Sequence, residues 1–282
     1  MPMTLKDYLR KKLLRRSILR YYERMPWEER TKEWEEVVEW LRHHRVTVFP
    51  YPFTERYDPA GVELHYDEEE GLFYTLYRGH RLYFHEGRDA RRARRYFNSI
   101  FMEQDPASPH RYLSEDFDVE EGDVVVDIGA AEGNFALDVV ERAGHVWLFE
   151  AGEQWQRPLQ LTFAPWRDKV TVVPKRVGAG SGEGQVTLDE FFRDREEKIG
   201  FLKIDVDGAE QEVFDGMQEL LKGQRIRRIA LCTYHRQGDA DHFARLLGDL
   251  GYRISFSPGY MIFRKRIEPP YLRRGVLKAV LP

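Results

Sequence analysis

The sequence predicts an α/β fold with a mostly parallel sheet, and two observations carry the prediction. From residue 122 onward, short runs rich in valine and isoleucine alternate with polar segments of helical length. Alternating strands and helices imply right-handed crossovers, which cover a parallel sheet on both faces. Before residue 95 the pattern is different, with two amphipathic helical segments followed by strands. We therefore expect an α/β domain with an N-terminal α+β extension.

The expected elements of the α/β domain follow from this periodicity. Helices are predicted at 134–142, 154–163, 208–222 and 239–250, and strands at 123–128, 146–150, 170–174, 201–206, 228–232, 253–256 and 261–264. Only the hairpin-length link 257–260 separates the last two strands, so one edge strand should run antiparallel. The predicted division is an extension at 1–95, the α/β domain at 96–266 and a C-terminal tail at 267–282.

The extension begins with a basic amphipathic segment. Between Leu5 and Arg20 the chain carries seven lysines and arginines against Asp7 alone, with leucines interleaved at helical spacing. One interpretation is peripheral contact of residues 5–20 with an anionic membrane surface or a lipid-linked substrate. The other is an ordinary docking helix with a solvated basic face. A second helix at 27–44, an antiparallel meander within 46–85 with a turn at 67–71, and an arginine-rich helix at 88–102 should follow.

Composition limits the classes of protein that this chain represents. Of its 282 residues, 42% are hydrophobic and 33% are charged, as in a soluble globular protein. No apolar run approaches the roughly 18 residues of a transmembrane helix, and the N-terminus does not resemble a secretory signal. The single cysteine, Cys232, excludes an intrachain disulfide. A net charge of −4 disfavours bulk nucleic-acid binding. These features favour the cytoplasm.

The loop after the first α/β strand is the expected ligand site, because ligands bind beyond the carboxyl ends of such strands. Residues 127–134 read Asp-Ile-Gly-Ala-Ala-Glu-Gly-Asn, and we expect Asp127 to face the crevice. Gly129 and Gly133 let backbone approach a ligand closely. The loop lacks the middle glycine of a dinucleotide fingerprint. The extra acid, Glu132, would repel a diphosphate but suits a cofactor with a sulfonium and an ammonium group.

An acid at the end of the second α/β strand supports a ribose-bearing ligand. Glu150 follows the glycine loop by about 20 residues, the spacing of acids that accept hydrogen bonds from ribose hydroxyls. A dense set of ionisable groups then ends the fourth strand, where residues 201–210 read Phe-Leu-Lys-Ile-Asp-Val-Asp-Gly-Ala-Glu. So many charges at one strand end indicate a functional site rather than solvated surface.

These motifs resemble those of the FkbM-type methyltransferases. The Asp-x-Gly loop at 127–129, Thr-Leu-Asp at 187–189 and Lys-Ile-Asp-x-Asp-Gly-x-Glu at 203–210 occur in the family's order, and the resemblance spans about residues 95–265. It implies a class I S-adenosylmethionine (SAM) methyltransferase fold, Rossmann-like with seven strands, and usually O-methylation of sugars, glycolipids or natural products. This chain departs from the family pattern at Asp207 and at 232–235, Cys-Thr-Tyr-His.

The resemblance and the loop chemistry together give the expected site. Asp205 would lie beside the sulfonium or the incoming hydroxyl, and Glu150 would hold the ribose. The remaining residues expected to line SAM belong to the glycine loop: Asp127, Gly129, Ala130, Glu132, Gly133 and Asn134.

A hydroxyl acceptor has to be deprotonated, and three side chains are candidates for the general base: His235, Asp205 and Asp207. A histidine titrates near neutral pH, whereas an unperturbed aspartate is a weak base. The alternative role of His235 is a hydrogen bond to neighbouring backbone. In a second mechanism, Asp205 or Asp207 would hold Mg²⁺, which would lower the pKa of the hydroxyl.

Three other functions compete with O-methylation. A nucleotide-dependent oxidoreductase is disfavoured by the missing glycine and by Glu132. A nucleic-acid amino-methyltransferase would carry Asn/Asp-Pro-Pro-Tyr/Phe where this chain has 203–210. A catalytically degenerate SAM-fold scaffold is the non-enzymatic alternative, which the intact glycine loop and acids disfavour.

Overall fold

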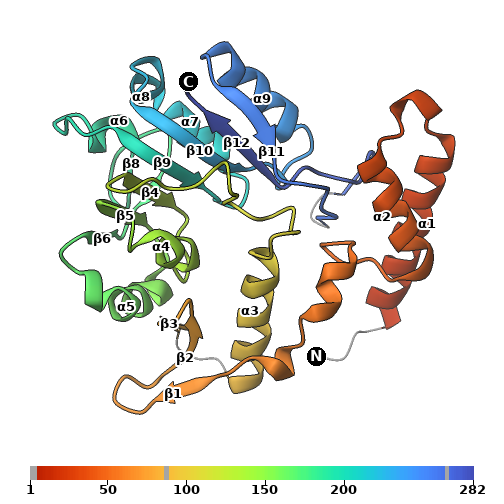
Figure 1. The fold of residues 1–282 in the computed structure, drawn as a ribbon, viewed down its shortest axis with the longest axis horizontal. Helices are drawn as coiled ribbons and strands as arrows, with labels where there is room; N and C mark the ends of the chain where they lie inside the picture. Colours follow the sequence, from red (N-terminus) through yellow and green to blue (C-terminus); the bar gives the residue numbers. More distant parts are fainter. Residues whose placement is uncertain (1–4, 86–88, 264–266) are drawn as a thin grey trace.

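The structure is a computed structural model that describes residues 5–85, 89–263 and 267–282. Figure 1 shows a large sheet with its helices and, at one side, the paired helices α1 (Leu5–Arg24) and α2 (Lys32–His43). The side chain of Thr31 caps α2 by accepting a hydrogen bond from the backbone N–H of Trp34. The expected helix at 27–44 thus begins at Lys32, and residues Trp27–Glu29 form a separate 3₁₀ turn.

The predicted meander is present as a three-stranded antiparallel sheet of β1 (His65–Asp67), β2 (Leu72–Tyr77) and β3 (His80–Tyr83). Gly71 closes its first turn with a φ of +69°, a conformation that glycine adopts without strain. Two further 3₁₀ turns, Pro52–Arg56 and Pro59–Gly61, precede the sheet. Helix α3 (Ala90–Glu103) follows it, and the predicted boundary between residues 95 and 96 falls inside this continuous helix.

The α/β part contains a seven-stranded sheet with the order β11-β12-β10-β9-β4-β5-β6. All its pairs are parallel except those of β12, which runs antiparallel to both β10 and β11. The chain proceeds from β4 outward in one direction and returns at β9 to build the other half, so strand order reverses between β4 and β9. The strands are β4 (Val124–Ile128), β5 (His145–Phe149), β6 (Val170–Val173), β9 (Ile199–Ile204), β10 (Ile226–Cys232), β11 (Arg253–Phe256) and β12 (Val276–Val280).

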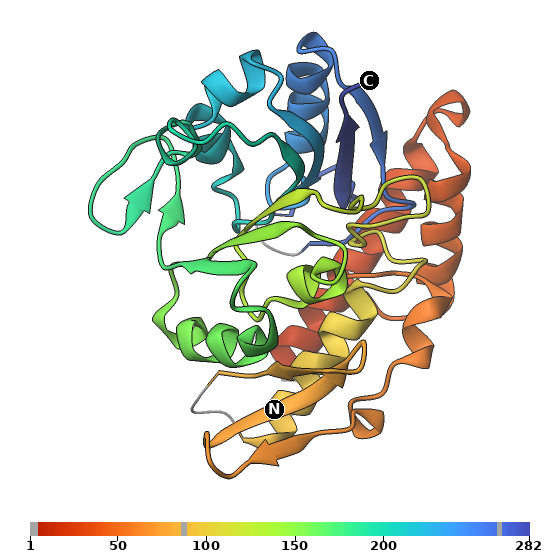
Figure 2. The same cartoon turned by 60° about the vertical axis from the view of Figure 1, so that its left-hand side comes forward.

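Alternate residues of these strands point into two different cores. Val125 and Phe201 belong to the core shared with the meander, α3, α4 (Asn134–Val139) and α5 (Glu153–Thr162). Val126 and Leu202 belong to the core on the opposite face. That face is covered by α6 (Leu188–Phe191), α7 (Glu210–Asp215), α8 (Gln218–Lys222) and α9 (Asp239–Asp249). The predicted two-faced burial of the sheet is confirmed, and Figure 2 shows the helices on both sides.

The helix expected at 208–222 is divided into α7 and α8 at Gly216. A Cβ atom on Gly216 would lie 2.1 Å from the carbonyl oxygen of Gly178, so the chain at this point packs directly against another backbone. The carboxylate of Asp189 then accepts hydrogen bonds from Glu219 and Leu220 and caps the new helix. Gly178 follows β7 (Arg176–Val177), which pairs with β8 (Gln185–Val186) in a short two-stranded sheet that was not expected.

The seventh strand was assigned to the wrong residues. Residues 261–263 make one isolated bridge, between Met261 and Arg273, and Arg264 lies outside the described residues. The strand is Val276–Val280, within the expected tail, and it lies one position inside the sheet edge rather than at it. Burial explains the outcome, because Val276, Leu277 and Ala279 are fully enclosed between β10 and β11.

The segment between β11 and β12 connects the sheet to the N-terminal helices. Ile262 and Leu272 from this segment form a third core with Ile18 of α1 and with Val37 and Leu41 of α2. The N-terminal helices therefore pack against the segment that links β11 to β12. Among the described residues, no helix has both the length and the apolar character required to cross a membrane.

Candidate active site

The glycine loop lies at the carboxyl end of β4, beside the point where strand order reverses. Gly129 has a φ of +76°, and a Cβ there would lie 2.0 Å from the carbonyl oxygen of Asp205. Gly133 has a φ of +86° and begins α4, where a Cβ would overlap Phe163 and Leu159 of the α5 region. Both glycines are therefore required by conformation and by space.

We predict that Gly129→Ala destabilises the protein far more than Gly122→Ala does. Both glycines have positive φ, so both variants bear the left-handed strain of about 1–2 kcal/mol. A Cβ on Gly122 meets no atom within 4 Å, whereas on Gly129 it would displace the Asp205 backbone. The free energy of unfolding in urea should fall by about 1–3 kcal/mol more for Gly129→Ala. Equal losses would contradict the close approach of β4 and β9.

Asp127 does not face the crevice as expected. Its carboxylate is fully buried and forms an ion pair with Lys203, whose Nζ lies 2.9 Å from Oδ1. The two residues are register partners on β4 and β9. Lys203 also donates a 2.7 Å hydrogen bond to the carbonyl oxygen of Gly129. The charges of Asp127 and Asp205 outweigh burial and raise the pKa of Lys203, so the ammonium is retained. The ion pair therefore holds the glycine loop in place through the hydrogen bond from Lys203 to Gly129.

Glu150 follows β5 and lies against the glycine loop. Its carboxylate accepts hydrogen bonds from the backbone N–H of Ala131 at 2.9 Å and of Gly152 at 2.6 Å. These two contacts orient an acid at the strand end, adjacent to Gly129 and Gly133. The expected acid and the expected glycines are therefore brought together.

Glu132 lies in the glycine loop and is covered by helix α3. Only 2% of it is exposed, and its carboxylate accepts a hydrogen bond from the hydroxyl of Tyr96 in α3. Burial raises the pKa of Glu132 to about 7, despite the opposing effect of that hydrogen bond. The neighbouring loop residues Ala130 and Asn134 are also buried. Helix α3, which spans the predicted boundary between the extension and the α/β domain, thus covers the glycine loop.

The pKa of Glu132 predicts a specific pH dependence of stability. Between its ordinary pKa of 4.5 and about 7, the folded state retains a proton that the unfolded state has lost. Stability is therefore highest below this window and falls as pH rises through it, by about 3 kcal/mol at most. Glu132→Gln should be more stable than wild type at pH 8 and similar to it at pH 5. Urea denaturation at both pH values measures this difference. An equal difference at both would contradict it.

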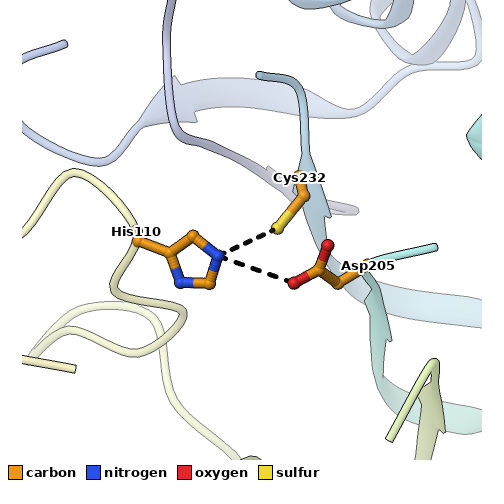
Figure 3. A group of neighbouring side chains, drawn as sticks. All are labelled: His110, Asp205 and Cys232. Atoms are coloured by element: carbon orange, nitrogen blue, oxygen red, sulfur yellow. Dashed lines mark hydrogen bonds and ion pairs between the residues drawn. The ribbon is translucent and has the colours of Figure 1, made fainter. Parts of the chain in front are cut away.

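Asp205 follows β9 and is the centre of a buried polar cluster. The hydroxyl of Tyr112 donates to its carboxylate at 2.8 Å, and that of Tyr234 lies at 3.4 Å. His110 approaches the same carboxylate at 3.5 Å, and its Nε2 lies 3.9 Å from the Cys232 sulfur (Figure 3). Burial alone would raise the pKa of Asp205, but the hydrogen bond from His110 and the charge of Lys203 hold it well below its usual range. Asp205 is therefore a permanent anion and a weak base.

His235 is placed beside Asp205 by a second acid. The side chain of His235 is 4% exposed, and its Nδ1 lies 2.7 Å from Oε1 of the buried Glu210. Glu210 opens α7, and its Oε1 also accepts a hydrogen bond from the backbone N–H of Gly208. The opposite nitrogen, Nε2, lies 3.6 Å from both Asp205 and Asp207. The contact of His235 is therefore with a carboxylate, and its Nε2 is directed to the ends of β9 and β10.

Asp207 differs from the other charged groups of this strand end. Its side chain is 91% exposed, on a turn where its φ is +54°. Two groups of described residues have the spacing to hold a metal ion: His110 with Asp205 and Cys232, and Asp205 with Glu210 and His235. Asp207 belongs to neither group. Because each group includes a nitrogen or sulfur ligand, neither matches the oxygen ligands that Mg²⁺ prefers.

Sequence reasoning missed three side chains that contact the carboxylate of Asp205: His110, Tyr112 and Tyr234. His110 and Tyr112 lie in the loop after α3, far from any glycine or strand-end motif, and Tyr234 was named only as part of a departure from the family pattern. A signal was available for Tyr234, which comes just after the predicted strand 228–232, but not for His110 and Tyr112. Arg111, between His110 and Tyr112, points elsewhere and donates to the carbonyl oxygens of Leu113 and Gln104.

Comparison with known proteins identifies the chemistry of this domain. Residues 183–254 match the Methyltransferase FkbM domain, and the matched segment contains 203–210 and His235. The predicted resemblance to the FkbM-type methyltransferases is confirmed. The strand order, with one antiparallel strand next to the edge, is that of the class I SAM-dependent methyltransferase fold. Residues 183–254 thus match a methyltransferase family model and lie in a sheet that has the topology of SAM-dependent methyltransferases.

Solved methyltransferase structures align with part of the chain. An rRNA methylase from Streptococcus thermophilus is 14% identical, with 58% of this chain and 90% of that chain covered and a TM-score of 0.39. Magnesium protoporphyrin IX methyltransferase from Synechocystis PCC 6803, with bound SAM, is 19% identical over 57% and 71% of the two chains, with a TM-score of 0.38. No curated protein matches this chain in sequence.

Proposed function

We propose that this FkbM-type methyltransferase transfers the methyl group of SAM to a hydroxyl oxygen, with His235 as the general base. The observation that carries the proposal is the 2.7 Å contact between Glu210 and His235 Nδ1, which leaves Nε2 beside Asp205. A histidine oriented by one buried acid and directed toward a strand end has the arrangement of a general base.

The residues present fit SAM, which supplies an electrophilic methyl group when it is bound. Because residues 129 and 133 are glycines, the loop backbone carries no side chains at these two positions. A Cβ atom at either position would overlap neighbouring atoms. Glu150 would accept the ribose hydroxyls, and the ionised carboxylate of Asp205 would favour a positively charged ligand. Asp127 would act indirectly, through the contact of Lys203 with the loop.

The base is assigned to His235 because the two acids are less suitable. Asp205 has a pKa well below its usual range, so it has little affinity for a proton from an alcohol. The side chain of Asp207 is nearly fully exposed, and no described residue orients it as Glu210 orients His235. His235 would accept the hydroxyl proton at Nε2, and Glu210 would stabilise the resulting imidazolium. Asp205 would orient the hydroxyl together with Tyr112 and Tyr234.

Titration with S-adenosylhomocysteine tests the cofactor half of the proposal. We expect the wild-type protein to bind it, Glu150→Gln to bind at least about tenfold more weakly, and the exposed control Glu141→Gln to bind like wild type. Binding should be the same with Mg²⁺ or with a chelator. If wild type shows no binding, the catalytically degenerate scaffold becomes the better interpretation.

A transfer assay tests the acceptor atom. The protein is incubated with deuteromethyl-SAM and mixtures of sugars, glycolipids and phenols, and labelled products are analysed by mass spectrometry and NMR. Labelled methyl ethers would support the proposal. Label found only on nitrogen, carbon or nucleic acid would overturn the assignment of a hydroxyl acceptor, while leaving the cofactor site intact.

A further inference from the structure

The first helix exposes a stripe of leucines to solvent. Leu5, Leu9 and Leu13 recur at intervals of four residues along one side of α1, and they are 75%, 49% and 62% exposed. Tyr8, next to this stripe, is 39% exposed. Isolated exposed leucines are ordinary, but three on successive turns form a continuous apolar surface.

Basic side chains lie on the same face of α1 as the leucines. At 100° per residue, Lys6, Lys12, Arg16 and Arg20 project on the same side of the helix as the leucines, and all four are exposed. Arg15 projects elsewhere and bonds to the carbonyl oxygens of Leu41 and Arg42 in α2. The exposed face therefore combines apolar surface with several positive charges.

The opposite side of α1 packs against α2 through its C-terminal half. Ile18 and Tyr22 are buried against Val38 and Leu41 of α2. Figures 1 and 2 both show α1 with α2 at one side of the molecule, outside the layers of the seven-stranded sheet. The leucine stripe thus faces away from the cores that the described residues form.

We propose that this face of α1 docks the protein on an anionic membrane surface. Leucines would enter the interfacial layer, and the flanking lysines and arginines would bind phosphate-bearing headgroups. A second copy of the chain is a poorer occupant, because pairing two such faces would bring like charges together. The face lacks the purely basic, polar character of a nucleic-acid contact.

Two neighbouring cavities lie between the docking helix and the segment that carries His235. One of about 490 Å³ is lined by Ser17, Arg20 and Arg24 of α1. A second, of about 470 Å³, is lined by Thr233 and Arg236, which flank His235 in sequence. The two cavities share the lining residues Tyr21, Met25 and Glu29. If the proposed function holds, docking through α1 would bring this side of the domain close to a membrane-anchored acceptor.

Vesicle sedimentation of the full chain tests the docking face without requiring methyl transfer. We expect the protein to bind phosphatidylcholine vesicles that contain phosphatidylglycerol, to bind pure phosphatidylcholine much less, and to be released by salt. Leu9→Ser/Leu13→Ser should weaken binding by about tenfold or more. Leu76→Ser, which removes a leucine that is 46% exposed on the meander, is the matched control and should bind like wild type.

Three results would overturn the docking proposal. These are the absence of binding to either vesicle, equal binding by the stripe variant, and a wild-type dimer that the same variant converts to a monomer in sedimentation velocity. The last result would assign α1 to a contact between copies. Because the substituted side chains are exposed, unchanged circular dichroism and melting temperature verify folding. Titration with S-adenosylhomocysteine separates this outcome from failure of the proposed function.

Discussion

Replacing Lys203 by methionine should destabilise the protein by about 3–5 kcal/mol, because it leaves a fully buried carboxylate without its cation. Asp127 has no exposed surface, and Lys203 is the ammonium partner at 2.9 Å. The same substitution removes the hydrogen bond to Gly129, so affinity for S-adenosylhomocysteine should also decrease. Urea denaturation and calorimetry measure the two effects.

The control for Lys203 is an ion pair of the same charge type at the surface. Arg142 and Asp118 lie 2.7 Å apart, but their side chains are 39% and 44% exposed. Arg142→Met should therefore cost no more than about 1 kcal/mol. Lys203→Met combined with Asp127→Leu removes both charges and should recover much of the lost stability. A loss below that of Arg142→Met would show that the buried pair is not needed.

Substitution of His235 should have the largest effect on turnover. We expect His235→Ala to reduce kcat by about 10²–10⁴-fold with the acceptor that the transfer assay identifies, since a positioned general base contributes this much. Affinity for S-adenosylhomocysteine should change little. Added imidazole should restore part of the rate. His242→Ala, which removes an exposed histidine bonded to Gln211, is the control and should remain active.

Glu210→Gln separates positioning of the base from a purely structural role. Without the carboxylate, the imidazolium of His235 loses its charged partner at 2.7 Å. We expect kcat to fall while the melting temperature and the affinity for S-adenosylhomocysteine change little, because the imidazole is no longer oriented by a charged acceptor. A loss of activity that is matched by losses of melting temperature and of cofactor affinity would assign Glu210 to the structure of the turn alone, where it also accepts a hydrogen bond from Gly208.

The glycine loop was predictable because its constraint is local. Positive φ and the absence of a side chain are properties of Gly129 and Gly133 themselves, and the length of the loop is set by the strand and helix that flank it. Glu150 was predictable for a similar reason, because its place at a strand end follows from a short apolar run. The match of 183–254 likewise rests on a contiguous motif.

Other parts of the site depend on contacts between distant segments. Asp127 and Glu150 both follow apolar runs, yet one carboxylate is buried against Lys203 and the other lies at the loop surface. Only the pairing of β4 with β9 distinguishes them. His110 and Tyr112 contact Asp205 although they lie 95 and 93 residues away in sequence. The spacing of apolar residues along the chain cannot predict such a contact.

The seventh strand shows the same limit at the level of the fold. Both 261–264 and 276–280 are short segments rich in apolar residues, and the shorter link favoured the first. The sheet takes the second, because Ile262 and Leu272, which precede it, pack with α1 and α2 instead. The sequence by itself thus determined the α/β class, the glycine loop and the family motif, which depend on local pattern. Tertiary structure decided the last strand, the partner of Asp127 and the surroundings of His235, because long-range packing selects among segments of equal local propensity.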